Sequence, residues 1–470
     1  ELLSRDGEES GYHGYFTHNY NSADPHYGTK EDLINLVSTA HEKGLKVILD
    51  VVPNHTPDYF NGSSSTYDSD SYQPAAPFNN PDWYHHFGDI TDWSDENQVL
   101  NYDLGGLDDL NQDNPDARQA IKDAYKAWVE DTGADGVRID AARSLPKDFI
   151  QEFENYLGVP SFGEIFVGDV DYVSDFSNYE WGVLDFPLFF QAREVFAHDA
   201  SFTTVKSIFD QDSKYNDVNH LVTFIDNHDR DRFLCLADDN YQKLRLALTF
   251  IFTVRGIPDV YYGTEQNCYG GGVPTEWAGI ANKENREVMP GFDEDGITFK
   301  YIQRLTELRK EYACLQTGTQ REMWAEDNIY AFSRRDDSNG QEIISVFNNG
   351  TSNETRAIPL RAESSLAVGT TLTNLLDTSV TATVEAGGIT GKVLNLTIPA
   401  KTAWVFTSDN VADYAPPART VTTIRVHYDV GLGNTMYLRG SDYPLTWDSG
   451  RSMLNVSSDV WVYDRQGREL

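Results

Sequence analysis

Three short apolar stretches of this sequence end in acidic residues, and this pattern restricts the fold more than any other feature. Gly136-Val137-Arg138-Ile139-Asp140 ends in Asp140, Ser161-Phe162-Gly163-Glu164 ends in Glu164, and the stretch from Phe224 reaches Asp229. The carboxyl ends of parallel strands in a barrel form one rim, where catalytic residues of barrel enzymes gather. The sequence therefore predicts a parallel β/α structure with carboxylates at the strand ends.

Helical and strand-like patterns alternate over the first two thirds of the chain. Asn114 is a helix N-cap candidate, and Pro115 suits the first helical position. Repeated units of this kind indicate a (β/α) barrel. Only six barrel strands can be found, whereas closure needs about eight, so the chain is expected to begin two strands late. The predicted helices are 30–43, 116–130, 190–209, 240–253 and 297–311, and the predicted strands are 45–52, 135–140, 161–166, 182–189, 220–226 and 257–262.

The pattern changes at several points, which predicts a multidomain chain. The segment 57–106 is rich in Ser, Asn, Asp, Pro and aromatic residues and is too long for an ordinary loop, so it reads as a small inserted domain. The barrel itself would comprise residues 1–56 and 107–316. After it, we expect an all-β domain at 317–410, a stiff Pro-containing linker at 411–418 and a partial β module at 419–470.

Charge and composition exclude several partner classes. With 74 acidic and 37 basic residues, the formal charge is −37, and such a surface repels nucleic acid and anionic membranes. The charge fits either a halophilic protein or an ordinary acidic secreted enzyme. No apolar run is long enough to span a bilayer, and no signal peptide is visible at the start. Three cysteines (Cys235, Cys268, Cys314) permit at most one disulfide and are expected to be structural thiols.

Four segments of the sequence resemble, in order and spacing, the signature regions of the α-amylase family of glycoside hydrolases. The sequence Leu107-Asp108-Asp109-Leu110-Asn111 resembles a fifth region, and 11–16 resembles a sugar-stacking loop, with Phe16 where Trp is usual. Within the family, 53–56 and 261–266 most resemble the branch that contains cyclodextrin glucanotransferases and related maltogenic and α-amylases. The resemblance implies a (β/α)8 TIM barrel with an inserted domain and a C-terminal all-β domain. The four segments are 50–55 (DVVPNH), 136–143 (GVRIDAAR), 163–166 (GEIF) and 224–229 (FIDNHD).

The resemblance assigns catalytic roles to the three strand-end acids. Asp140 would be the nucleophile of a retaining glycosidase, in which the two carboxyls lie about 5 to 5.5 Å apart. Arg138, two residues away on the same strand, should keep Asp140 ionised. Glu164 has apolar sequence neighbours that should raise its pKa toward that of a general acid. Asp229 would hold sugar hydroxyls and help to distort the ring. For any single acid, the alternative is a solvated rim charge.

The resemblance also implies a set of substrate contacts. His55 and His228 would bind the same glucose, Tyr15 would stack on it, and Phe166 would be a platform on the leaving-group side. Arg286 matches a donor-side sugar contact, although a lone surface arginine is an equally simple interpretation. The full substrate-binding set is His13, Tyr15, His55, Arg138, Phe166, His228 and Arg286.

A calcium site is the cofactor that the resemblance implies. Asn54 and Asp109 match structural calcium ligands, and the backbone carbonyl near Ser144 is the expected third. Hard oxygen ligands from the barrel and the insert suit Ca²⁺, which would hold the two together. The alternative is an ordinary hydrogen-bonded Asn and Asp. In many relatives Lys and His occupy the places of Arg143 and Ser144, which weakens inferences about leaving-side contacts.

The predicted activity is retaining endo-hydrolysis of α-1,4-glucosidic bonds in starch and related glucans. Cyclising relatives carry a large aromatic residue where this chain has Gly105, and Ile165 replaces a usual Trp. Both changes favour water as the acceptor. The alternatives are a cyclodextrin glucanotransferase or maltogenic-type transglycosylase, an α-glucosidase, and an inactive carbohydrate-binding homologue.

A polymeric substrate has consequences for the partners and the location of the protein. Starch is too large to import, so an extracellular enzyme is expected, acting on starch and α-1,4-glucan oligosaccharides as a monomer. Trp447 and Trp461 are candidates for starch contacts in the last β module, although aromatic residues of such modules often form the core instead.

Overall fold

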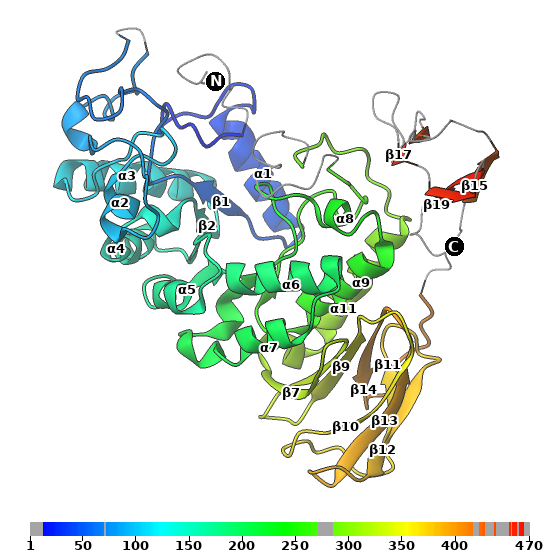
Figure 1. The fold of residues 1–470 in the computed structure, drawn as a ribbon. Coiled ribbons are helices and arrows are strands. Elements are labelled where there is room, and N and C mark those ends of the chain that lie inside the picture. The colour runs from blue at the N-terminus through cyan, green and yellow to red at the C-terminus, as the bar shows by residue number, and fades with distance from the viewer. Residues whose placement is uncertain are drawn as a thin grey trace. The chain divides into compact units, whose positions relative to one another are not determined.

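The computed structural model describes residues 13–69, 72–270 and 285–416, and beyond these the backbone of five short strands. The chain forms two compact units. The first unit comprises Glu1–Phe186 and Ser213–His220, and the second comprises Pro187–Asp212 and Leu221–Leu470. Figure 1 colours the chain from blue to red along its length. Among the described helices, none has the length and apolar character that crossing a membrane requires.

The first unit contains a parallel sheet of four short strands. They are β1 (Ile48–Val51), β2 (Gly136–Ile139), β3 (Ser161–Gly163) and β4 (Gly182–Leu184), paired in that order. The register sets Asp50 opposite Arg138. The strands lie where the sequence predicts them but are shorter. The first begins late because the backbone N–H of Leu45 donates to the carbonyl of Ala40 and so closes the preceding helix.

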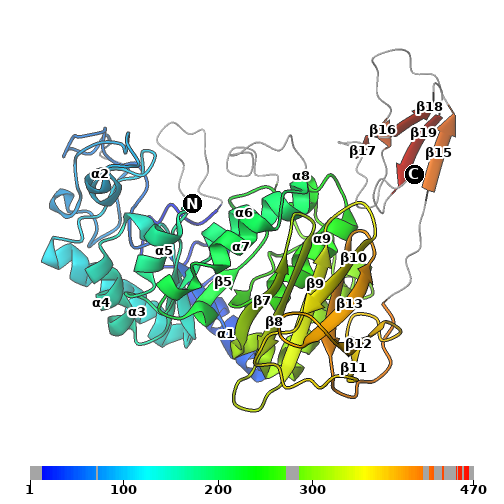
Figure 2. The ribbon, with the colours of Figure 1, turned by 60° about the horizontal axis from the view of Figure 1, so that its bottom comes forward.

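Local signals explain the two helices that the sequence predicts in this unit. Helix α1 (Lys30–Glu42) begins at a reciprocal capping box between Thr29 and Asp32. Helix α3 (Pro115–Thr132) begins at Asn114, whose side chain accepts from two backbone N–H groups, as predicted. Two further helices, α4 (Lys147–Leu157) and α5 (Val170–Phe176), complete the β/α alternation. Helices α3 and α4 lie side by side (Figures 1 and 2).

The segment between β1 and α3 has little regular structure. It contains the short helices η1 (Pro81–Trp83) and α2 (Glu96–Asn101) and a buried aromatic cluster of Tyr59, Phe60, Phe78 and Tyr84. An isolated antiparallel bridge pairs His55, after β1, with Asp109, before α3. The two ends of this 57–106 segment therefore meet at the carboxyl end of β1.

The start of the second unit differs from the sequence-based prediction in where the strand ends and in the number of helices that follow. The predicted strand 182–189 is wrong in its second half, because helix α6 (Phe186–His198) begins at Phe186. The predicted helix 190–209 is two helices, α6 and α7 (Thr203–Phe209). The break falls at Asp199, which has a left-handed backbone (φ 60°) that does not continue a helix. Its carboxylate forms ion pairs with Lys243 and Lys401.

Among the remaining β/α elements of the second unit, the helices agree closely with the prediction, whereas the strands predicted at 220–226 and 257–262 are much shorter than predicted. Strands β5 (Leu221–Thr223) and β6 (Ile257–Pro258) pair in parallel. Helix α9 (Tyr241–Thr253) connects them and is buried almost all round. Helix α11 (Ile297–Glu311) has the predicted bounds. The two shorter helices are α8 (Phe233–Leu236) and α12 (Ala313–Thr317).

An antiparallel sheet follows these helices in the second unit (Figure 2). Its strand order is β10-β13-β12-β11-β14-β9-β8-β7. Buried aliphatic side chains of alternate strand positions form its core. Phe250 of α9 packs edge to face with Phe347 of β9 at 5.8 Å between ring centroids. The strands are β7 (Thr319–Ala325), β8 (Ile329–Arg335), β9 (Glu342–Asn348), β10 (Glu354–Pro359), β11 (Thr371–Asn374), β12 (Thr381–Ala386), β13 (Lys392–Ile398) and β14 (Thr402–Thr407).

Only strand backbone is described after residue 416. Strands β15 (Thr423–His427), β19 (Val460–Asp464) and β18 (Leu454–Ser457) form one antiparallel sheet, and β16 (Tyr437–Leu438) pairs with β17 (Arg451–Ser452). Trp447 and the side chain of Trp461 lie outside the described residues. Cys235, Cys268 and Cys314 are buried, which agrees with their interpretation as structural thiols.

Candidate active site

The tips of β2 and β3 place two acidic side chains next to each other on neighbouring strands. The backbone N–H of Asp140 donates to the carbonyl of Val51, and that of Glu164 donates to the carbonyl of Ile139, both at 2.9 Å. The sheet hydrogen bonding therefore continues one residue past each strand. Both residues are buried, with exposed fractions of 8% and 9%.

Arg138 connects the acidic side chains of this site. Its Nη1 donates to Oδ1 of Asp140 at 2.7 Å and to Oδ1 of Asp50 at 2.8 Å. Its Nη2 lies 2.8 Å from Oε2 of Glu164. One buried guanidinium thus contacts three carboxylates, each on a different strand or strand end. The forked arginine side chain fixes the positions of the carboxylates relative to one another.

The protonation state of Asp140 differs from the sequence-based expectation. Burial raises the pKa of Asp140 to about 8, Arg138 opposes this shift, and the charges of Glu164 and Asp50 add to it. The sequence shows the single Arg138 charge but not the two competing carboxylates around it. Three carboxylates with one guanidinium retain a proton near neutral pH, and that proton belongs to the coupled group rather than to one residue.

This shift predicts a pH dependence of stability. The pKa of Asp140 is about 8 in the folded protein, against an ordinary value of 3.8. Between these pH values the folded protein therefore binds more protons than the unfolded protein. The free energy of unfolding should therefore fall as pH rises from about 4 to about 8. Asp140→Asn should flatten this slope, as measured by urea unfolding at several pH values.

Asp24 provides a control for this prediction, because its pKa is lowered whereas that of Asp140 is raised. A backbone hydrogen bond from His26 lowers the pKa of Asp24 to about 2. Its contribution to stability is present above its unfolded pKa and is lost as pH falls toward 2. Asp24→Asn should therefore change stability at acid pH and leave the slope between pH 4 and 8 as in the wild type. An unchanged slope in Asp140→Asn would contradict the assignment.

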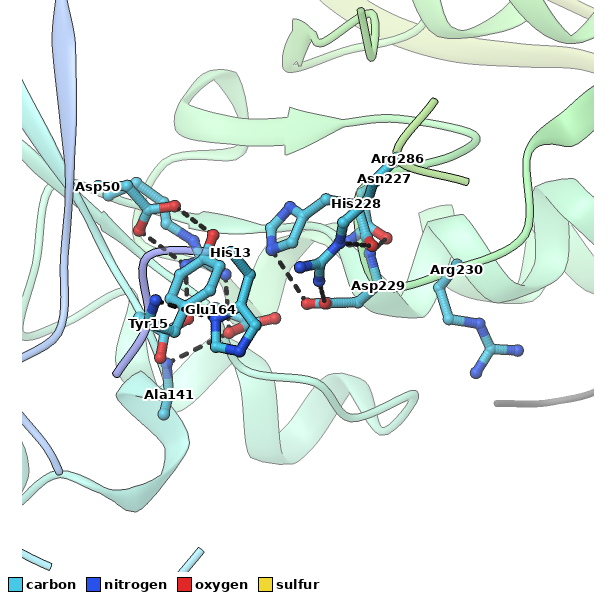
Figure 3. A network of polar contacts seen from close by, with 12 residues as sticks. His13, Tyr15, Asp50, Ala141, Glu164, Asn227, His228, Asp229, Arg230 and Arg286 are labelled. Carbon is cyan, nitrogen blue, oxygen red and sulfur yellow. Dashed lines mark hydrogen bonds and ion pairs between the residues drawn. The ribbon is translucent and has the colours of Figure 1, made fainter. Parts of the chain in front are cut away.

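The residue after Asp140 has an unusual backbone conformation. Ala141 has a left-handed backbone with φ 48°, which is strained for a residue with a Cβ. Its backbone N–H donates to Oε2 of Glu164 at 3.2 Å (Figure 3). The strained turn thus supplies a hydrogen bond that orients the Glu164 carboxylate.

Tyr15, His13 and His55 are placed around this carboxylate group. The Tyr15 hydroxyl donates to Oδ2 of Asp50 at 2.7 Å (Figure 3). The guanidinium carbon of Arg138 lies 5.7 Å from the Tyr15 ring centroid. His13 Nδ1 accepts from the backbone N–H of Tyr15 at 3.0 Å. His55 Nε2 lies 4.0 Å from Oδ2 of Asp140. Burial lowers the pKa of His55 to about 4, so its imidazole is neutral at pH 7.

Phe166 lies two residues beyond Glu164 and is half-buried. Its ring packs against that of Phe186 with 4.6 Å between centroids. Ile165, between Phe166 and Glu164, is fully buried. The two residues that follow Glu164 are thus packed into apolar surroundings, while the Glu164 carboxylate itself pairs with Arg138.

The second unit carries a separate cluster around Asp229. His228 Nε2 lies 3.2 Å from Oδ2 of Asp229, and Arg286 Nη2 donates to Oδ1 of Asp229 at 2.8 Å (Figure 3). Arg286 also donates from Nε to the carbonyl of His228 at 2.9 Å. The alternative of a lone surface arginine is wrong, because Arg286 forms an ion pair with the predicted third acid.

Asn285 is a residue of this cluster that the sequence analysis missed. Its Nδ2 donates to the carbonyls of Asn227, His228 and Arg230 at 3.3, 2.6 and 2.9 Å. Asn285 therefore holds the turn that carries Asp229. The sequence distance of nearly sixty residues gives no signal for this contact, apart from its position directly before Arg286.

Asn54 and Asp109 are fully buried and provide oxygen atoms that fit a cation. Oδ1 of each residue is buried without a hydrogen-bond partner. Oδ2 of Asp109 contacts His85 Nδ1 at 2.6 Å. Burial raises the pKa of Asp109 well above its usual range, and a cation would reverse that shift. Ser144 is buried, and the role of its carbonyl stays a prediction. No cluster of three or more His, Cys, Asp or Glu with metal-binding geometry occurs within the described ranges.

Comparisons with known sequences identify the family of this chain. The family described as "Alpha amylase, catalytic domain" matches residues 4–296. The β/α-amylase of Paenibacillus polymyxa is 38% identical over 410 residues, which cover 85% of this chain and 32% of that protein. A cyclomaltodextrin glucanotransferase of Bacillus sp. (strain 38-2) is 33% identical over 422 residues, which cover 85% of this chain and 56% of that protein. The chain thus spans about a third and just over half of these two relatives.

Solved structures give the same result for the fold. CldA, described as the first cyclomaltodextrin glucanotransferase with a three-domain ABC distribution, matches with TM-score 0.76 and 31% identity over 87% of this chain and 85% of that chain. An α-amylase from Geobacillus thermoleovorans, complexed with acarbose, matches with TM-score 0.72 and 30% identity over 86% of each chain. The predicted fold class is confirmed: six parallel strands of a TIM barrel lie in the described residues, as the sequence predicted, and an all-β domain follows them. The match over residues 4–296 and the relatives of 33 to 38% identity show that this chain belongs to the α-amylase family of glycoside hydrolases.

Proposed function

We propose that this protein hydrolyses internal α-1,4-glucosidic bonds of starch and related glucans with retention of anomeric configuration. The observation that carries the proposal is the pair of buried carboxyls, Asp140 and Glu164, held by one guanidinium of Arg138. Two carboxyls at neighbouring strand tips can act on the same glycosidic bond, which a double-displacement mechanism requires.

The reaction follows in two steps. In the first, Asp140 attacks the anomeric carbon and forms a covalent glycosyl ester, while Glu164 donates its proton to the departing glycosidic oxygen. In the second, Glu164 takes a proton from water, whose oxygen attacks the anomeric carbon and releases Asp140. Each step breaks one bond to the anomeric carbon and forms another, and Glu164 recovers its proton at the end.

The contacts of Arg138 support this division of roles. A proton retained by the carboxylate group near neutral pH is available for the acid step, provided that it resides on Glu164 when the substrate is bound. Arg138 donates a hydrogen bond to Asp140 and so favours its anion over its acid. The Ala141 N–H fixes the direction of the Glu164 carboxyl.

The surrounding residues provide groups that bind sugar hydroxyls. We assign Tyr15 to stacking on the sugar, with Asp50 fixing its hydroxyl. Neutral His55, whose buried Nε2 has no hydrogen-bond partner, is suited to donate to a hydroxyl. By the family resemblance, Asp229 and His228 bind further hydroxyls, and Arg286 orients Asp229.

Transglycosylation is the second candidate, favoured by the names of the relatives. Two of the proteins compared above are named cyclomaltodextrin glucanotransferases. Against it, position 105 carries glycine with a left-handed backbone (φ 61°), where a large side chain would be strained. The position therefore offers no aromatic ring around which a glucan could wrap, and water is the expected acceptor.

The test is the product pattern from soluble starch. Wild-type protein should release linear maltooligosaccharides, initially as α-anomers, and Glu164→Gln should release almost none. Glu322→Gln serves as control, because Glu322 lies on β7 of the antiparallel sheet. Predominantly cyclic products would favour the transferase, and β-anomers would contradict the retaining mechanism.

We also propose that Asn54 and Asp109 bind calcium. When bound, the ion would compensate the charge of buried Asp109. It would also link the two ends of the 57–106 segment, which the His55–Asp109 bridge brings together.

Chelation of calcium with EGTA should lower the melting temperature of the protein. Calcium at about 100 times its Kd should restore about 2.7 kcal/mol of stability. In Asp109→Asn the melting temperature should no longer respond to calcium, whereas in Asp113→Asn it should respond as in the wild type. An unchanged response in Asp109→Asn would contradict the assignment.

The proposal also covers the location of the protein and the role of its last β module. A polymeric glucan is met outside the cell, so we propose an extracellular protein that acts as a monomer. The strands beyond residue 422 are proposed to belong to a starch-binding module. If so, removal of residues 419–470 should reduce binding to raw starch granules and leave hydrolysis of soluble starch intact.

A further inference from the structure

We propose that Glu287 is a positioning residue for sugar binding in the second unit, and that it acts by holding Arg286 against Asp229. This inference rests on the proposed glucan cleavage, in which Asp229 binds sugar hydroxyls. All three residues belong to the second unit. The proposal extends the site to a carboxylate that takes part in binding only through its neighbour in the chain.

Both oxygens of the Glu287 carboxylate accept hydrogen bonds. Oε2 accepts from Nε of Arg232, with which it forms an ion pair. Oε1 accepts from the backbone N–H groups of Tyr269 and Gly270 at 3.2 and 2.8 Å. The backbone carbonyl of Glu287 accepts from the Tyr262 hydroxyl at 2.8 Å. Segments that lie far apart in the sequence therefore meet at Glu287 and fix its position.

Arg232 is a rigid partner for this carboxylate. Arg232 is fully buried, and its guanidinium carbon lies 4.5 and 5.0 Å from the ring centroids of Tyr261 and Tyr262. Its Nη1 donates to the carbonyl of Tyr262 at 2.7 Å. Removing the carboxylate from a buried guanidinium leaves a charge without its counter-ion, which is costly. The ion pair therefore keeps Glu287 in one place.

Arg286 lies between two anchored residues of the chain. On one side, the Asn285 side chain donates to carbonyls of the turn that carries Asp229. On the other side, Glu287 is held by Arg232. Nη2 of Arg286 donates to Oδ1 of Asp229 at 2.8 Å (Figure 3). A binding group is precise only when the residues behind it are themselves fixed. Glu287 thus sets the position of Asp229 through Arg286.

The position requires a carboxylate rather than an amide. Both oxygens of Glu287 face hydrogen-bond donors, whereas a glutamine has one oxygen and an NH₂ group that only donates. In Glu287→Gln, the NH₂ group must face either Nε of Arg232 or the backbone N–H groups at 269 and 270. One of these contacts is then lost. We expect the segment 285–287 to shift and Arg286 to hold Asp229 less well.

The experiment is a double-mutant cycle between Glu287 and Arg286 on soluble starch, measured well below the melting temperature of every variant. Glu287→Gln should lower kcat/KM roughly tenfold, as expected for the loss of one hydrogen bond between charged groups. Arg286→Ala should lower it at least as much. The double variant should match Arg286→Ala, because two residues that act on the same contact do not have additive effects.

Two results of this cycle would overturn the proposal. Additive losses in the double variant would show that Glu287 acts independently of Arg286. Wild-type kcat/KM in Glu287→Gln, with a lowered melting temperature, would show that Glu287 only stabilises the fold. Glu294→Gln is the matched control, because Glu294 is an exposed acid on the same stretch of chain, and it should change neither the kinetics nor the melting temperature.

The same cycle also separates this proposal from the proposed function. If the wild type does not cleave starch, the proposed function is overturned, and the four proteins are compared by the Kd of maltoheptaose in isothermal titration calorimetry. The expected order of the variants is the same in that assay. Additive losses of affinity, or an unchanged Kd in Glu287→Gln, would overturn the proposal there as well. Absence of binding by the wild type would overturn both.

Discussion

Asp140→Asn is expected to lower kcat on soluble starch by a factor on the order of 10⁶, as for other removed nucleophiles. The amide keeps the size of the carboxyl and can still contact Arg138, but it cannot form the glycosyl ester. The fold should survive, because burial already makes the charged form of Asp140 costly. Release of reducing ends measures the effect, and circular dichroism checks the fold.

Asp50→Asn is the matched control for this variant. Asp50 accepts from the same Nη1 of Arg138, at 2.8 Å against 2.7 Å for Asp140, but 43% of its side chain is exposed. It should lose far less activity, through the position of Tyr15. If both variants lost activity equally, the effect would belong to the Arg138 contacts, and the nucleophile would have to be assigned elsewhere.

Arg138→Met is expected to lower the free energy of unfolding at pH 7 by about 3 to 5 kcal/mol. The substitution leaves Asp140 and Glu164 buried without their cation, so they must either ionise at high cost or take up protons. The loss should shrink below pH 4, where carboxyls are protonated in both the folded and the unfolded protein. Urea unfolding at pH 7 and pH 3.5 measures the difference.

Arg118→Met is a control with similar contacts at the surface. Arg118 pairs with Asp148 at 2.9 Å and Glu152 at 2.6 Å, and 75% and 45% of these acidic side chains are exposed. Solvated ion pairs contribute about 0 to 1 kcal/mol, so this variant should lose little stability. A loss in Arg138→Met no larger than in Arg118→Met would contradict the buried charge group.

The sequence predicted those elements whose signals are local. Helix α11 has the predicted bounds, and α3 begins at the predicted cap, because caps and apolar periodicity act within a few residues. The prediction for the stretch 182–190 was wrong in its second half because it, too, rested on a local signal alone. Its apolar run fits a buried strand or a buried helix equally well, and tertiary packing decided that the helix begins at Phe186.

The sequence by itself determined the family, through the order of its motifs, and it proposed Asp140, Glu164 and Asp229, which follow strand-like stretches, as the residues that carry the chemistry. Only the tertiary structure decided how the pKa values of these residues shift and which other residues hold them in position. Arg138 lies among three carboxylates, so the pKa of Asp140 is raised rather than lowered. Asn285 holds the Asp229 turn. These effects depend on burial and on contacts between residues far apart in the chain, and neither has a local pattern in the sequence.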